Sequence, residues 1–192
     1  MSESTRLTVL GMVRRRPRSY GYSLVDEVQR WSGPEGVVPA PRAVYKALEV
    51  LRDGRLIEPL QVVSDRDVGG PSRRRYIATP AGERRYEAWL SSPPESFADL
   101  FRRLATARED DLPELVELVV TAEHQLIAHH RDLRAPEVGS LVKEQAPWEA
   151  VCAAALAAAE RNEVASRATF LRDLRRTLED LRERPNAGTV AP

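Results

Sequence analysis

The residues best suited to binding chemistry include two cationic side chains and one phenolic side chain on a predicted helix. Residues 41–52 carry apolar side chains spaced three and four apart, which predicts a helix with one buried face. Arg42, Tyr45 and Lys46 lie on its opposite face, within the first turns. A helix presented in this way can enter a major groove, where arginine reads guanine and tyrosine or lysine contacts phosphate.

A second basic group follows a glycine-rich connection. Arg73, Arg74 and Arg75 come directly after Gly69-Gly70-Pro71. A flexible tip of this kind can approach a sugar-phosphate backbone, and arginines beside it can enter a minor groove. Either group alone is typical of a solvated surface, but a basic helix followed by a basic hairpin indicates binding to nucleic acid.

These groups need a scaffold, and the pattern before residue 91 predicts one. Tyr20 and Tyr22 stand at the start of the second helix, where hydroxyl and backbone donors commonly contact phosphate. The predicted third helix ends at Asp53-Gly54, where glycine suits a left-handed cap. The order of elements predicts a winged helix-turn-helix. They are helices at 5–15, 19–31 and 41–52, strands at 56–63 and 73–78, and a helix that Thr79 caps and Pro80 opens.

The second half of the chain has the pattern of long helices with narrow apolar seams. Consecutive prolines within residues 91–96 stop the preceding helix. Amphipathic segments follow from residue 97, over 112–133, and from Pro147 to about Arg184. Such seams cannot bury themselves on a small wing domain, so antiparallel pairing with a second copy is expected. The seam of the last helix consists of Val164, Leu171, Leu174, Leu178 and Leu181.

The predicted fold class is therefore mainly α with a small β-hairpin, a winged helix-turn-helix joined to a helical dimerisation domain. The expected organisation is a DNA-binding domain (1–90), a linker (91–96), a helical dimerisation domain (97–184) and a fraying tail (185–192).

Composition and charge agree with this interpretation. Of 192 residues, 42% are hydrophobic and 30% charged, which is typical of a soluble globular protein. Residues 1–90 hold 16 basic against 11 acidic residues, and residues 91–192 hold 13 against 18, so the first half suits an anionic partner. The absence of any run of 18 apolar residues argues against a membrane span. A basic cluster placed after the first apolar segment argues against export, and the single Cys152 fits the cytoplasm.

Enzymatic chemistry is not expected. The sequence shows no glycine-rich phosphate loop and no nucleophile with an evident base. His124, His129 and His130 lack metal-ligand spacing, so neither a metal nor a cofactor is predicted. Trp148, at the start of the last helix, is the candidate for lining a small-molecule effector pocket, although an aromatic residue there can equally pack at an interface.

Several segments together resemble the PadR family of transcriptional regulators. They are Leu10-Gly11-Met12-Val13, residues 16–24 with Tyr20-Gly21-Tyr22, residues 44–57 with Tyr45-Lys46-Ala47-Leu48, and Tyr76-Ile77-Ala78-Thr79-Pro80-Ala81-Gly82. The resemblance is strong over residues 5–90 and looser beyond, where the two-helix half is similar to the longer subfamily. It implies a dimer that represses a nearby gene from double-stranded operator DNA, with release by a small ligand in many members.

The chain departs from the family pattern at the groove-facing positions. Members usually read Pro-Gly-Thr-Leu-Tyr-Pro where this chain has residues 41–46, and usually have histidine where this chain has Tyr20. The operator therefore need not resemble the family's common one.

Two other functions stay open at this point. One is a winged helix that binds protein, which a salt titration separates from DNA binding, because only the latter releases counterions steeply. The other is activation instead of repression, without a small-molecule ligand.

Overall fold

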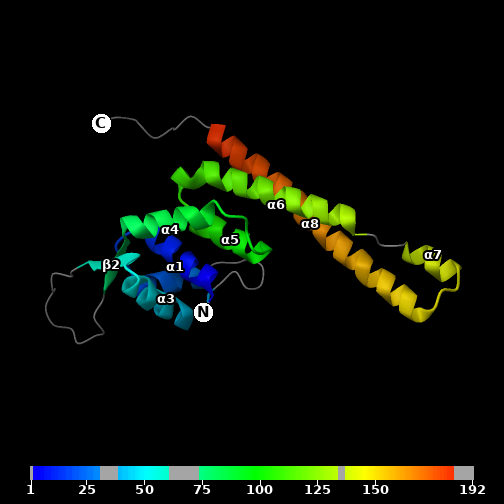
Figure 1. The fold of residues 1–192 in the computed structure, drawn as a ribbon, viewed down its shortest axis with the longest axis horizontal. Coiled ribbons are helices and arrows are strands. Elements are labelled where there is room, and N and C mark those ends of the chain that lie inside the picture. The colour runs from blue at the N-terminus through cyan, green and yellow to red at the C-terminus, as the bar shows by residue number, and fades with distance from the viewer. Residues whose placement is uncertain (1, 31–38, 61–73, 134–136, 184–192) are drawn as a thin grey trace. The chain divides into compact units, whose positions relative to one another are not determined.

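The computed structural model describes residues 2–30, 39–60, 74–133 and 137–183 (Figure 1). It divides into two compact units, Met1–Leu115 and Val116–Pro192. Most of the described chain is helical, and a small antiparallel sheet lies in the first unit. The predicted fold class, mainly helical with a small β element, is confirmed.

The first unit has the element order of a winged helix-turn-helix. From the N-terminus these are α1 (Glu3–Arg15), β1 (Ser19–Tyr20), α2 (Gly21–Gln29), α3 (Pro41–Asp53), β2 (Ile57–Leu60), β3 (Arg75–Ala78), α4 (Pro80–Leu90) and α5 (Phe97–Thr106). The short turn η1 (Glu109–Asp111) then leads into α6 (Leu112–Asp132), which continues into the second unit.

The sheet has the order β1-β3-β2 and is antiparallel throughout. Ser19 pairs with Tyr76 on one side of β3, and Leu60 pairs with Arg75 on the other. The sequence predicted β2 and β3 but not β1, because two residues are too few to show an alternating pattern. The expected end of the second helix at residue 31, the last residues of the first expected strand (61–63) and the connection at 64–72 lie outside the described residues.

Two helix ends test the capping predictions. The Thr79 hydroxyl accepts a hydrogen bond from the Gly82 backbone N–H at 3.1 Å, as predicted. At the end of α3 the left-handed residue is Arg55 (φ 56°) and not Gly54 (φ −77°). The Leu56 N–H donates to the Leu51 carbonyl at 2.9 Å, which is the closing bond of a Schellman motif centred one residue later than expected.

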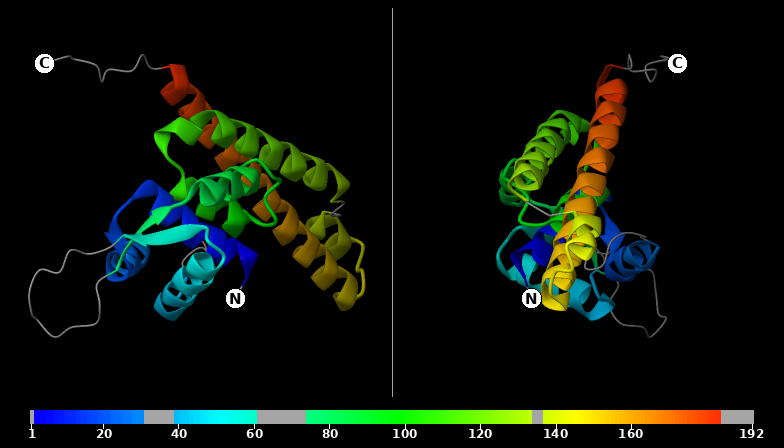
Figure 2. Two further views of the ribbon diagram at one scale, coloured as in Figure 1. Left: turned by 60° about the vertical axis from the view of Figure 1, so that its left-hand side comes forward. Right: turned by 90° about the vertical axis from the view of Figure 1, so that its right-hand side faces the viewer.

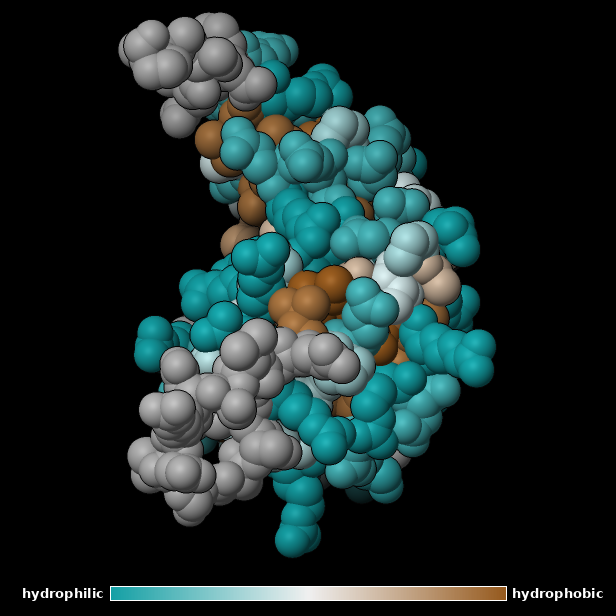
Figure 3. Space-filling model, turned by 90° about the vertical axis from the view of Figure 1, so that its left-hand side faces the viewer, coloured by the Kyte–Doolittle hydropathy of each residue, from teal (hydrophilic) through white to brown (hydrophobic). Residues whose placement is uncertain are grey.

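Helix α1 is the centre of the first unit. It contacts α3, α4 and α5 (Figure 1). Its Leu10 and Val13 side chains are almost completely buried. A Cβ on Gly11 would lie 2.4 Å from the Tyr86 ring, so only glycine lets α4 approach α1 this closely. Hydrophilic side chains cover much of the face seen from the side of β2 (Figure 3).

Tyr86, in this core, gives a pH-dependent prediction. Its side chain is fully buried, its hydroxyl lies 3.0 Å from the Thr106 hydroxyl, and burial raises its pKa to about 12. The folded state therefore favours the neutral phenol. This contribution is complete below pH 10 and is lost as the pH rises toward 12, by roughly 2 kcal/mol.

The measurement is the free energy of unfolding in urea between pH 8 and pH 11. Tyr86→Phe is the matched variant, expected to lose about 1 kcal/mol at pH 8 with its hydrogen bond and to fall less steeply above pH 10. Equal slopes for the two proteins would contradict the prediction.

A buried ion-pair cluster joins α1, α4 and the approach to α6. The Arg14 guanidinium donates to both carboxylate oxygens of Asp111, at 2.8 Å for one of them, and also to Glu83. The Arg108 backbone N–H donates to Asp111 at 2.8 Å, and its side chain donates to the Arg14 carbonyl. Burial lowers the pKa of Arg14, but the hydrogen bonds and charges of Asp111 and Glu83 outweigh it and raise that pKa above its ordinary value.

Helix α5 belongs to the first unit, whereas the sequence placed residues 97 onward with the second half. The buried Arg103 side chain donates to the Trp89 carbonyl at 2.6 Å, and to Asp99 at 2.6 Å. Asp99 in turn accepts from the Ser4 hydroxyl at 2.6 Å. These bonds tie α5 to the end of α4 and the start of α1, so the prolines at 91–96 make a turn within a unit. The boundary between units falls at Leu115–Val116.

The second unit is helical. It holds most of α6, the short α7 (Val138–Lys143), which the sequence did not predict, and α8 (Trp148–Glu183). Helices α6 and α8 lie side by side (Figures 1 and 2). The buried Glu123 carboxylate of α6 accepts from Arg175 at 2.9 Å and from Arg172 at 3.3 Å, both on α8.

The apolar residues of α8 lie along one broad stripe, of which one edge is buried and the other exposed. Val164, Leu171 and Leu178, which the sequence assigned to a seam between copies, are already buried within one chain. Leu174 is half-buried, and Leu181 is 43% exposed. One chain therefore covers much of the expected seam, because α8 packs that face inside its own fold.

No helix of the described chain is long and apolar enough to cross a membrane.

Candidate nucleic-acid interface

Helix α3 has the two faces that its sequence predicts. Val44 and Ala47 are fully buried, whereas Arg42 and Lys46 are exposed and Tyr45 is 48% exposed. Pro41 opens the helix, where its missing N–H costs nothing. The buried face fixes the helix against α1 and α2, so the exposed side chains are presented from a rigid element.

The predicted tyrosines and one predicted arginine meet in a stack beside α3. The rings of Tyr20 and Tyr22 lie 5.5 Å apart at 15°, and the Arg75 guanidinium lies 4.8 Å from the Tyr20 ring centroid. Tyr20 and Arg75 are direct neighbours across β1 and β3. A Cβ on Gly21 would lie 3.2 Å from the Tyr45 ring, so glycine allows the start of α2 to lie against α3. Side chains from β1, α2, α3 and β3 thus adjoin.

The cations of this surface differ electrostatically from the other basic cluster in the unit. Within the described ranges, Arg42, Lys46, Arg74 and Arg75 are exposed and form no ion pair. By contrast, each arginine of residues 14–16 is paired with a carboxylate. The exposed cations of α3 and β3 are therefore available to an anion.

The buried carboxylate of Glu27 explains part of this difference. It accepts from Arg15 at 2.7 Å and lies 3.3 Å from Arg16, so it neutralises the end of α1 and ties α2 to it. Sequence reasoning did not single out Glu27. The signal was its position three residues after Leu24, on the apolar face of α2, where an acidic residue needs a basic partner.

Arg18 is a further candidate that the sequence reasoning missed. It is exposed, has a left-handed backbone (φ 68°) and donates its N–H to the Tyr76 carbonyl at 2.9 Å. That bond places Arg18 at the start of β1, beside the central strand of the sheet. The turn-forming Arg16-Pro17-Arg18 sequence was the available signal.

Other predicted site residues are not brought into this surface. Arg73 and Gly69-Gly70-Pro71 lie outside the described residues. Trp148 is 73% exposed at the first position of α8, and its effector role stays a prediction. His129 lies 3.8 Å from Glu160, and the described residues hold no cluster of three or more potential metal ligands.

Comparison with known proteins finds a likeness among solved structures. No family model matches the chain, and no curated protein matches it. Among solved structures it is similar to PadR of Bacillus subtilis in complex with operator DNA. The sequence identity is 18% and the TM-score 0.37, over 93% of this chain and 99% of that chain. A likeness this weak carries no argument about function.

Proposed function

We propose that this protein is a cytoplasmic, homodimeric transcriptional repressor that binds a specific double-stranded operator and is released from it by a small-molecule effector. The observation that carries the DNA-binding part is the surface made by α3 and β3. It combines exposed cations without ion-pair partners in the described chain with a tyrosine–arginine stack, all on a winged helix. Enzymatic activity has no part in this proposal.

In the proposed complex α3 lies in the major groove. Arg42, in its first turn, reaches a guanine edge with two hydrogen bonds, and Tyr45 and Lys46 contact phosphates. The Tyr20–Tyr22 stack at the N-terminus of α2 provides further phosphate contacts, and Tyr20 holds the Arg75 guanidinium against its ring by a cation–π interaction. Arg74 and Arg75 then follow the backbone beside the wing.

The test is recovery of genomic DNA fragments bound by the purified protein, followed by the same selection with Arg42→Ala. Because Arg42 reads one base pair in this geometry, the variant should lose preference at one position of each half-site, by roughly 1–3 kcal/mol. Positions read by other residues should keep their preference. An unchanged site logo, or no enriched fragment for the parent protein, would refute the assignment.

The homodimer is supported by the exposed edge of the apolar stripe of α8. Leu156 is 74% exposed, Phe170 42% and Leu181 43%. Spacings of 14 and 11 residues place all three on one side of the helix, along the edge of the stripe opposite to the edge that holds Val164 and Leu171. We propose that this exposed edge, and not the buried one, contacts the second copy.

Leu156→Glu combined with Leu181→Glu is expected to give a folded monomer by sedimentation, because each copy brings two charges into the proposed contact. The matched control is Ala155→Glu with Asn162→Glu, which adds the same charge to exposed positions on another side of α8 and should leave the dimer intact. A dimer that persists in the leucine variant would place the contact elsewhere.

A further inference from the structure

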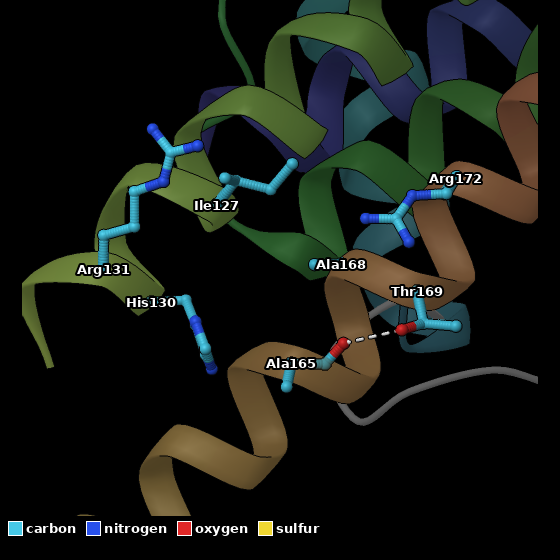
Figure 4. A pocket seen from close by; sticks show the side chains of 7 residues that line it. All are labelled: Ile127, His130, Arg131, Ala165, Ala168, Thr169 and Arg172. Atoms are coloured by element: carbon cyan, nitrogen blue, oxygen red, sulfur yellow. Dashed lines mark hydrogen bonds between the residues drawn. The ribbon is translucent and has the colours of Figure 1, made fainter. Parts of the chain in front are cut away.

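A hollow lies between α6 and α8 in the second unit (Figure 4). Its volume is about 380 Å³, within the range of pockets that hold small molecules. Small side chains create it: Ala165 and Ala168 face α6 across the gap, opposite Ile127. The floor of the hollow is therefore apolar.

The rim of the hollow is cationic. His130 and Arg131 line it from α6, and Arg172 lines it from α8, with its guanidinium directed toward the gap (Figure 4). None of the lining residues is acidic. The Arg172 Nε bonds the Glu123 carboxylate at 3.3 Å, and within the described ranges its terminal nitrogens bond no other residue.

The neighbouring contacts hold this arrangement in place. Arg175, one turn beyond Arg172, bonds the other oxygen of Glu123 at 2.9 Å and Glu179 at 3.3 Å. Glu123 thus has a second basic partner, and the Arg172 terminal nitrogens stay available to a ligand. The Thr169 hydroxyl donates to the Ala165 carbonyl at 3.1 Å, which leaves its oxygen able to accept a bond at the edge of the hollow.

We propose that this hollow binds a small organic anion. The apolar body of the ligand packs on Ala165, Ala168 and Ile127, and its carboxylate, sulfonate or phosphate group bonds the Arg172 guanidinium, while Arg131 and His130 line the rim from α6. A purely apolar ligand would leave the cationic rim without a counter-charge, and an inorganic anion would leave the floor uncovered. The effector role of this ligand rests on the proposed function, whereas its binding does not.

The experiment uses a pair of fluorescent probes of nearly the same shape. Anilinonaphthalene sulfonate is an organic anion, and N-phenyl-1-naphthylamine is the same ring system without the sulfonate. The free protein should bind the anion at one site per chain. The neutral probe should bind with an affinity at least about 10-fold lower. Equal affinity for both probes would overturn the proposal, because the rim would then contribute nothing.

Two variants test the location. Arg131→Gln with Arg172→Gln should weaken binding of the sulfonate about 10-fold. Ala165→Leu, which fills the floor and keeps every charge, should weaken binding of the sulfonate by at least as much. Arg161→Gln with Arg176→Gln removes the same charge from α8 outside the hollow and should bind like the parent. Unfolding in urea shows that each variant is folded, and a folded Ala165→Leu that binds like the parent refutes the site.

A second measurement separates this proposal from the proposed function. The sulfonate is titrated into the complex of the protein with its recovered operator fragment. Release of DNA by the parent but not by Ala165→Leu supports both proposals. If the probe binds without releasing DNA, the binding site is supported and its effector role is refuted. If the probe binds to a protein that recovers no DNA, the binding site is supported and the proposed function is refuted.

Discussion

Arg14→Met is expected to destabilise the protein by about 3–5 kcal/mol. The Arg14 side chain is 6% exposed and Asp111 is 7% exposed, so their charges lie almost entirely away from water. Removal of the arginine leaves the buried Asp111 carboxylate without its bidentate partner and takes one partner from Glu83. The loss of a buried partner costs far more than the intact pair contributes, because the remaining carboxylate keeps its desolvation cost.

The measurement is the free energy of unfolding in urea. Arg85→Met is the matched control, because Arg85 pairs with Glu3 and both side chains are about half exposed. The same substitution there should change stability by less than about 1 kcal/mol. Similar losses for the two variants would show that Arg14 is no more important than a surface ion pair.

Arg74→Ala with Arg75→Ala is expected to abolish most DNA binding at physiological salt. If each arginine neutralises one phosphate, the slope of log Kd against log salt should fall by about two, and affinity should fall for every DNA sequence. Arg75 should contribute the more specific geometry, since the Tyr20 ring fixes its guanidinium. Titration of a labelled duplex over a range of salt concentrations measures both quantities.

The control is another pair of adjacent arginines in the same unit. Arg84 and Arg85 are exposed on α4, so Arg84→Ala with Arg85→Ala removes the same charge away from the proposed surface. That variant should keep the parent's salt slope to within about one unit. If DNA binding by the parent protein does not depend on salt, a winged helix that binds protein would be favoured. If the two double variants have equal salt slopes, the DNA interface does not include β3.

Much of the fold could be predicted from local pattern. Apolar residues at helical spacing identify α3 and its exposed face, and Thr79 with Pro80 identifies the start of α4. Helical spacing is therefore enough to propose Arg42, Tyr45 and Lys46 together as one surface. The positions of Tyr20 and Arg75 were predicted separately, but their direct contact was not, because a strand as short as β1 has no pattern of its own.

What only the tertiary structure decided is the choice of partner for each group. The sequence shows arginines at 14–16 and at 73–75 as similar runs, yet Glu27, Asp111 and Glu83 neutralise the first of them. The sequence also shows one apolar stripe along α8, but packing within one chain selects Val164, Leu171 and Leu178 for burial and leaves Leu181 exposed at the other edge of the stripe. Periodicity depends on residues a few positions apart, and so the sequence alone reveals it. Ion pairing and burial depend on residues up to 97 positions apart, which only the folded chain brings together.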